Sequence, residues 1–163
     1  MSDYLHLNVQ PDDLRAMSSL ALAHMGDAVY EILVRGWLCT QGRATCGNLH
    51  KETVALVRAE AQAAAVEKLL PHLTEAEGAV YRRGRNAHVH AIPKNASRGQ
   101  YTRATGLEAL FGWLYLQGQL ERINQLFGII MEEKEGLGYA VGCRLLNRDC
   151  PRVPSRRGGR SCG

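Results

Sequence analysis

Paired cysteines are missing from this sequence. The 163-residue chain has five cysteines, an odd number, and no two of them form a C-x-x-C pair. A disulfide framework needs an even set of cysteines, and a zinc site needs closely spaced ligands. We therefore expect reduced thiols, as in a cytoplasmic protein, at Cys39, Cys46, Cys143, Cys150 and Cys162.

Long hydrophobic runs are missing as well. No apolar stretch approaches the roughly 20 residues that a membrane-spanning helix needs. The opening stretch, MSDYLHLNVQPDDL, has no basic region followed by an apolar one, so it does not resemble a secretory signal peptide. The sequence therefore predicts a cytoplasmic protein with no membrane partner.

Acidic residues are missing from one part of the chain. Residues 82–103 carry six basic residues and no acid, and residues 144–163 carry a net charge of +5. Because the net charge of the whole chain is +4, the remainder carries −7. Two basic segments on an acidic body fit a polyanionic partner that binds at defined places. A solvated loop and a disordered tail would explain the same composition, so charge alone leaves both interpretations open.

Helical periodicity is present through most of the chain, and no strand pair is recognisable. It predicts an all-α helical bundle that forms a domain over residues 1–135. Glycine, proline and arginine dominate residues 136–163, so we expect this basic tail to be disordered or loosely attached. The expected helices, of which the first should be buried and central, cover residues 18–38, 48–70, 74–83, 101–117 and 119–135.

Local signals set the expected helix ends. Asn48 is a candidate N-cap, and Pro71 should end the same helix because proline cannot continue it. Thr74 and Glu77 have the T-x-x-E spacing of a capping box. Residues 84–100 lack periodicity and should form a long loop, and such loops in compact domains are often functional.

Two acidic residues lie in otherwise apolar helical segments. Asp27 follows Gly26 in ALAHMGDAVYE, and Glu108 lies in TGLEALFGWLYL. We expect both carboxylates to be buried between packed helices, where an ionised carboxylate is costly unless it is paired or binds a metal. Together they can hold a hard cation such as Mg²⁺. A salt bridge to an arginine, or a surface position, would explain each acid taken singly.

These segments also resemble the motifs of a known family. ALAHMGDAVYE resembles the signature helix of the ribonuclease III family, and LEALFG resembles its second acidic motif. NLHKETVALVRAEAQAAAV is similar to the helix that follows the signature. RRGRNA at 82–87 and PKN at 93–95 resemble one branch, Mini-ribonuclease III. The resemblance covers about residues 15–134, with four motifs in the family order.

The resemblance implies an all-α endonuclease that works as a homodimer on double-stranded RNA, each active site cutting one strand. The expected substrate in this branch is precursor large-subunit ribosomal RNA. Asp27 and Glu108 match the two catalytic acids that hold Mg²⁺, and metal-bound hydroxide would attack the phosphodiester in line. The sequence departs from classical members, which have further acids where this chain has Ala23 and Thr105. Water and RNA phosphates would then supply more of the metal ligands.

The resemblance also implies how the RNA and the second subunit are contacted. Only 28 residues follow Glu135, too few for the double-stranded-RNA-binding domain of classical members, so the basic loop should take over part of the duplex contact. His24 lies where relatives have an aromatic residue that packs across the dimer interface. A non-catalytic RNA-binding module is the main rival, and retention of both acids speaks against it. The candidates for phosphate and 2′-hydroxyl contacts are Arg82, Arg83, Arg85, Asn86, Lys94 and Asn95.

Overall fold

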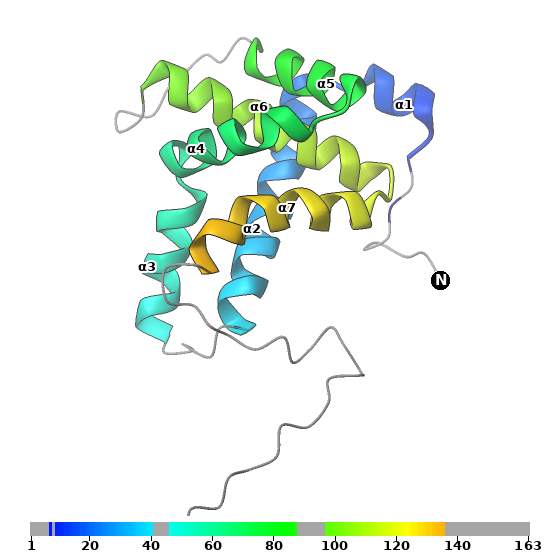
Figure 1. Ribbon diagram of the computed structural model, residues 1–163. Helices are drawn as coiled ribbons and strands as arrows, with labels where there is room; N and C mark the ends of the chain where they lie inside the picture. Colours follow the sequence, from blue (N-terminus) through cyan, green and yellow to red (C-terminus); the bar gives the residue numbers. More distant parts are fainter. Residues whose placement is uncertain (1–6, 8, 41–45, 88–96, 136–163) are drawn as a thin grey trace, which may run out of the picture.

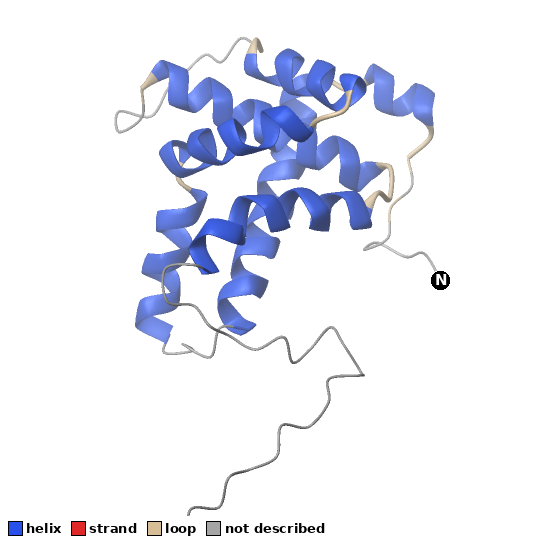
Figure 2. Cartoon of the chain, in the orientation of Figure 1, coloured by secondary structure: helices blue, strands red, loops and turns tan. Residues whose placement is uncertain are grey.

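The computed structural model describes residues 7, 9–40, 46–87 and 97–135, and in these residues every regular element is a helix (Figure 2). The expected all-α fold is therefore confirmed. The boundary at residue 135 and the tail stay a prediction, because residues 136–163 lie outside the described part. No described helix is long and apolar enough to cross a membrane. The helices are α1 (Pro11–Ala16), α2 (Ser19–Thr40), α3 (Cys46–Val57), α4 (Ala59–Leu69), the short 3-10 helix η1 (Leu70–His72), α5 (Glu75–Arg85), α6 (Arg98–Leu116) and α7 (Leu120–Glu135).

The capping box predicted for α5 is present. Thr74 Oγ1 accepts a hydrogen bond from the Glu77 backbone N–H at 3.3 Å, and Glu77 Oε2 accepts one from the Thr74 N–H at 2.8 Å. The break after α6 is also as expected, because Gly118 has a φ of 69°, which glycine adopts without strain.

The expectation of one continuous helix over residues 48–70 is wrong, because the structure has two helices there, α3 and α4. The chain breaks at Arg58, whose backbone is extended (φ −63°, ψ 150°), and Asn48 lies inside α3 and does not cap it. No proline or glycine marks this break. The two halves pack on different partners, α3 on α2 and α4 on α6, so tertiary packing overrides the continuous helical propensity.

Two further differences concern helix starts. The helix expected from residue 101 begins at Arg98, because Ser97 and Gln100 form a second capping box that shortens the loop. The short helix α1 was not expected from the sequence. It follows Gln10 and has proline at its first position, where the missing N–H costs nothing.

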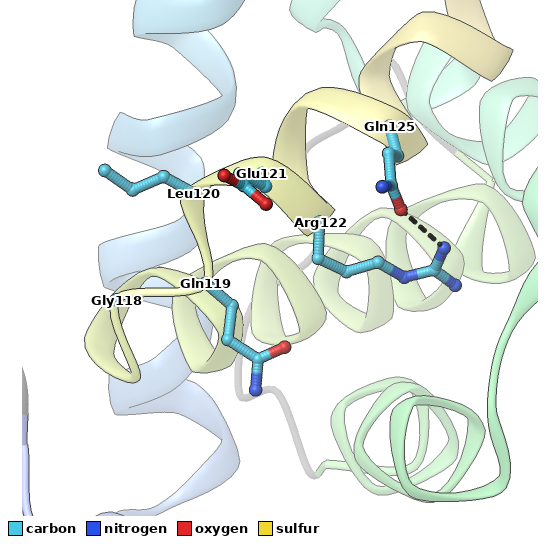
Figure 3. A pocket seen from close by; sticks show the side chains of 6 residues that line it. All are labelled: Gly118, Gln119, Leu120, Glu121, Arg122 and Gln125. Carbon is cyan, nitrogen blue, oxygen red and sulfur yellow. Dashed lines mark hydrogen bonds between the residues drawn. The ribbon is translucent and has the colours of Figure 1, made fainter.

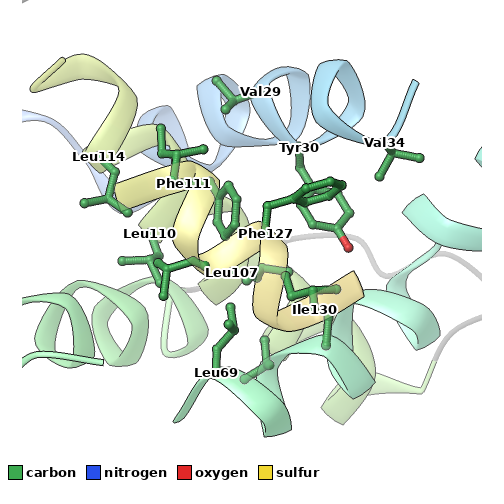
Figure 4. Packing of buried hydrophobic residues seen from close by; sticks show 14 of the residues in the cluster. Val29, Tyr30, Val34, Leu69, Leu107, Leu110, Phe111, Leu114, Phe127 and Ile130 are labelled. Atoms are coloured by element: carbon green, nitrogen blue, oxygen red, sulfur yellow. The ribbon is translucent and has the colours of Figure 1, made fainter. Parts of the chain in front are cut away.

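The centre of the molecule is α6, not the first long helix as expected. It packs against α2, α4, α5 and α7 (Figure 1). Tyr30 of α2 meets the rings of Phe111 and Phe127 edge-on, with centroids 5.6 and 6.1 Å apart. Figure 4 shows this group, with Leu107 and Leu110 of α6 beside it. The helix α2 keeps one side open, and Ile32 on that side is 68% exposed.

Candidate active site

The helices α2 and α6 cross with their backbones in contact. A Cβ atom added to Gly26 would lie 1.6 Å from the Glu108 carbonyl oxygen, and one added to Gly112 would lie 2.0 Å from the Leu22 carbonyl oxygen. Only glycine permits this approach. Asp27 directly follows Gly26 in sequence, so the crossing brings Asp27 and Glu108 to one place.

Asp27 is exposed in the single chain, so the expectation that it would be buried is wrong. The helices nevertheless remove part of its hydration. This desolvation, followed by the negative charge of Glu31, raises the pKa of the Asp27 carboxyl, and the nearby His24 lowers it by a smaller amount. The carboxylate lies on the edge of the crossing, where solvent and a large substrate can reach it.

Glu108 is half-buried at the same crossing. Burial, followed by the negative charge of Asp27, raises the pKa of Glu108 to about 7, while the Gln62 amide lowers it. The charge of Asp27 therefore disfavours the ionised form of Glu108. Two carboxylates held together in this way bind a cation favourably, because the cation removes their repulsion.

Glu31 does not belong to this pair. Its Oε1 accepts a hydrogen bond from Arg35 Nε at 3.0 Å, so it serves as a salt-bridge partner. At the two positions where classical members have further acids, this chain has Ala23 and Thr105. Both are buried, and neither can take the place of an acidic metal ligand. Ala23 is 5% exposed, and Thr105 is 4% exposed and donates its hydroxyl to the Tyr101 carbonyl at 3.0 Å.

Gln62 of α4 is a site residue that the sequence analysis missed. It is 1% exposed and lies beside Glu108. The available signal was its spacing, since Gln62 falls on the same helical stripe as the buried residues Ala65, Val66 and Leu69. A polar side chain on the apolar stripe of a helix indicates a specific buried partner.

The donor set at the crossing suits a hard cation. It consists of the carboxylates of Asp27 and Glu108, whose oxygens are ligands that Mg²⁺ accepts. Among the described residues, no group of three or more His, Cys, Asp or Glu side chains is placed so that it could hold a metal ion. The protein ligands are thus few, and a cation held here would keep several positions for water or substrate.

The basic end of α5 flanks this crossing. Arg82, Arg83, Arg85 and Asn86 are all exposed, and no acidic side chain of the described part forms an ion pair with these arginines. Gly84 anchors the end, because its Cα lies against α6, where an added Cβ would be 2.6 Å from Ala109 Cβ. The predicted contacts Lys94 and Asn95 lie outside the described residues.

The open side of α2 carries the residue predicted for a dimer interface. His24 is exposed, and Ala28 and Ile32, one and two turns further along the helix, are exposed with it. Spacing of four residues places them on one stripe. An apolar stripe of this kind suits contact with another protein surface.

A pocket of about 580 Å³ lies elsewhere, at the turn between α6 and α7 (Figure 3). Its lining includes Arg122, whose guanidinium is already engaged by the buried Glu77 at 2.8 Å and by the His72 carbonyl at 2.7 Å. None of the predicted site residues lines it. The candidate site is therefore the open helix crossing and not this pocket.

Known proteins are similar to this chain in sequence and in fold. The family model of the ribonuclease III domain matches residues 20–119. A Mini-ribonuclease 3 from Symbiobacterium thermophilum is 48% identical over 107 residues, which cover 66% of this chain and 82% of the relative. A Mini-ribonuclease 3 from Streptococcus pneumoniae is 37% identical over 126 residues, which cover 76% of this chain and 98% of the relative.

A crystal structure of a protein from Fusobacterium nucleatum superimposes with a TM-score of 0.69 at 30% identity, covering 75% of this chain and 98% of that one. Both acids and the helix crossing fall inside the matched range of 20–119. The chain therefore belongs to the ribonuclease III family and is an endoribonuclease.

Proposed function

We propose that the chain cleaves double-stranded RNA with Mg²⁺ as its cofactor, and that Asp27 and Glu108 hold the cation. The observation that carries the proposal is the glycine-mediated crossing of α2 and α6, which brings the two acids together. Enzymes of this family generally depend on a divalent metal and act on double-stranded RNA. Precursor large-subunit ribosomal RNA is the substrate that the resemblance to the Mini-ribonuclease III branch implies.

The roles of the two acids follow from their surroundings. Asp27, on the exposed edge, binds the cation where a phosphodiester can approach, and half-buried Glu108 fixes its inner side. A bound divalent cation supplies an activated water and stabilises the leaving oxygen in phosphodiester hydrolysis. Because the pKa of Glu108 is raised to about 7, its carboxyl group is protonated at lower pH, so we expect cation binding to weaken as the pH falls below neutral.

The duplex would be held beside this site by the basic end of α5. Arg82, Arg83, Arg85 and Asn86 are exposed on the helix that packs against α6 near Glu108. Lys94 and Asn95 remain candidates from the sequence. Arginine contacts to phosphates give affinity and register with little base specificity, which suits an enzyme that recognises duplex shape.

We propose a homodimer in which each subunit cuts one strand. The exposed stripe of α2, with His24 and Ile32, is the surface we assign to the subunit contact. It lies on the same helix as Asp27. Two such subunits related by a twofold axis would bring their two sites to one side of a duplex.

The direct test is cleavage of a long RNA duplex by the purified protein. We expect short double-stranded products with Mg²⁺, no products with a chelator, and little cleavage of a single strand of the same sequence. Binding of the duplex without cleavage at any Mg²⁺ or Mn²⁺ concentration would indicate a non-catalytic RNA-binding protein and contradict the proposal.

A further inference from the structure

Gln62 is buried with its hydrogen-bonding capacity unused. The side chain is 1% exposed, and neither Oε1 nor Nε2 has a hydrogen-bond partner of standard geometry among the described residues. Burial of an unpaired amide is unfavourable, so such a group in a folded protein needs an explanation. A partner that the amide meets only in the working enzyme would provide one.

The position of Gln62 indicates what this partner is. The helix α4 carries Gln62 and packs against α6, which carries Glu108. The amide lies close enough to the carboxyl group to lower the pKa of Glu108, although the geometry is not yet that of a normal hydrogen bond. A small movement of either side chain would complete the bond, because the amide is already near enough to act on the carboxyl group.

Other groups that could hold Glu108 in place are missing from the described part of the site. Ala23 has no polar side chain, and the Thr105 hydroxyl is used by the Tyr101 carbonyl. Asp27 repels an ionised Glu108. The Gln62 amide, in contrast, acts on Glu108 as a hydrogen-bond donor and lowers its pKa.

We propose that Gln62 is a positioning residue for the divalent-cation site: its Nε2–H donates to one Glu108 carboxylate oxygen and turns the other toward Asp27 and the cation. This inference rests on the proposed function. The bond strengthens when the cation holds Glu108 ionised, since hydrogen bonds to charged acceptors are stronger than neutral ones. Without the cation, the amide is a destabilising group; with it, the amide is satisfied.

Gln62→Met tests this role, because methionine keeps the length and shape of the side chain and removes both polar atoms. Cation binding is measured by titration calorimetry with Mn²⁺ on the full chain, and thermal stability is measured with and without Mn²⁺. We expect the dissociation constant to rise about 10-fold or more, as for other partners that orient metal ligands. The melting temperature without Mn²⁺ should be equal to or higher than that of the parent.

Thr53→Val is the matched control. Thr53 is also buried and polar, but it lies on α3 and donates its hydroxyl to the Leu49 carbonyl at 2.8 Å. Removal of this hydroxyl should leave the Mn²⁺ dissociation constant unchanged.

Gln62→Asn is a second test variant. It keeps the amide but withdraws it from Glu108 by one methylene, so it should weaken Mn²⁺ binding as Gln62→Met does.

The outcomes separate this inference from the proposed function. Unchanged Mn²⁺ binding by Gln62→Met would overturn the positioning role. The role would also be overturned if both Gln62 variants bound Mn²⁺ more weakly but had lost thermal stability as well, because the weaker binding would then reflect damage to the fold. Asp27→Asn and Glu108→Gln are titrated in parallel. If they bind Mn²⁺ as the parent does, the proposed metal site itself fails; if they lose binding and the Gln62 variants do not, only the inference fails.

Discussion

At the scale of single residues, Glu77 shows how one buried acid links three parts of the fold. It completes the cap of α5, and its carboxylate binds the Arg122 guanidinium, which in turn reaches the His72 carbonyl. The Arg122 hydrogen bond is the largest cause that lowers the pKa of Glu77, and burial opposes it. The ionised form of Glu77 therefore stabilises the folded state.

We expect Glu77→Gln to lower the free energy of unfolding at pH 7 by about 1.5–3 kcal/mol, the value of a hydrogen bond to a charged group. The folded pKa lies below the ordinary 4.5, so the contribution is complete above pH 4.5 and is lost as the pH falls through the folded pKa. Urea denaturation at pH 7 and pH 3 measures the difference. Glu75→Gln, an exposed change on the same helix, is the control and should have little effect at either pH.

The sequence predicted part of the candidate site at this scale. Asp27 and Glu108 stood out because each interrupts an apolar helical segment. The expectation that Asp27 is buried was wrong. Periodicity shows which residues share a face of a helix, but it does not show whether a neighbouring helix covers that face. Gln62 was missed because its meaning depends on its distance from Glu108, which is 46 positions later in the chain and comes close only after folding.

At the scale of helices, capping signals were predictable and helix breaks were not. Thr74 and Glu77 carry their cap in the local sequence, and Ser97 with Gln100 has the same pattern, overlooked within an aperiodic stretch. The break at Arg58 has no local signal. It exists because α3 and α4 find different packing partners, and only the assembled bundle contains that information.

The crossing of α2 and α6 is the most demanding contact between helices. Gly26→Ala places a methyl group against the Glu108 carbonyl, so the helices must separate. We expect a loss of at least about 3 kcal/mol of stability, measured by urea denaturation, together with a loss of cleavage. Gly128→Ala on α7 is the control, since nothing lies within 4 Å of the added Cβ, and it should be neutral or stabilising by up to about 1 kcal/mol. Equal stability of the two variants would contradict the close crossing.

The basic end of α5 is predicted to bind the RNA backbone. The double variant Arg83→Gln, Arg85→Gln should weaken duplex binding. It should also reduce the slope of log affinity against log salt concentration by roughly 0.9 for each phosphate contact that is lost, if the value for B-form DNA applies. Arg15→Gln with Arg58→Gln removes the same charge from arginines paired with Asp12 and Glu60, and it should leave the slope nearly unchanged. Binding titrations across a salt series compare the two. Equal slopes for both double variants would place the RNA contact elsewhere.

At the scale of the whole molecule, we predict a dimer that depends on the open stripe of α2. Light scattering at micromolar concentration should give twice the 18.0 kDa mass of the chain. Ile32→Glu, which puts a charge on a residue that is 68% exposed in the single chain, should give a folded monomer. Leu120→Glu, an equivalent change at the start of α7, should remain dimeric. A monomeric parent that still cuts both strands would contradict the prediction.

The central claim is that Asp27 and Glu108 form one metal-dependent centre for RNA cleavage, and single-turnover cleavage of a long RNA duplex in Mg²⁺ tests it most directly. Asp27→Asn and Glu108→Gln change one atom each and keep the size of the side chain; Glu31→Gln, one turn from Asp27, is the control. We predict that each site variant loses at least about 1000-fold in cleavage rate, because the cation stabilises the transition state by several kcal/mol. Its helical circular dichroism and its binding of the duplex should be unchanged. Glu31→Gln should cut at nearly the parent rate. Near-parent cleavage by either site variant would contradict the claim.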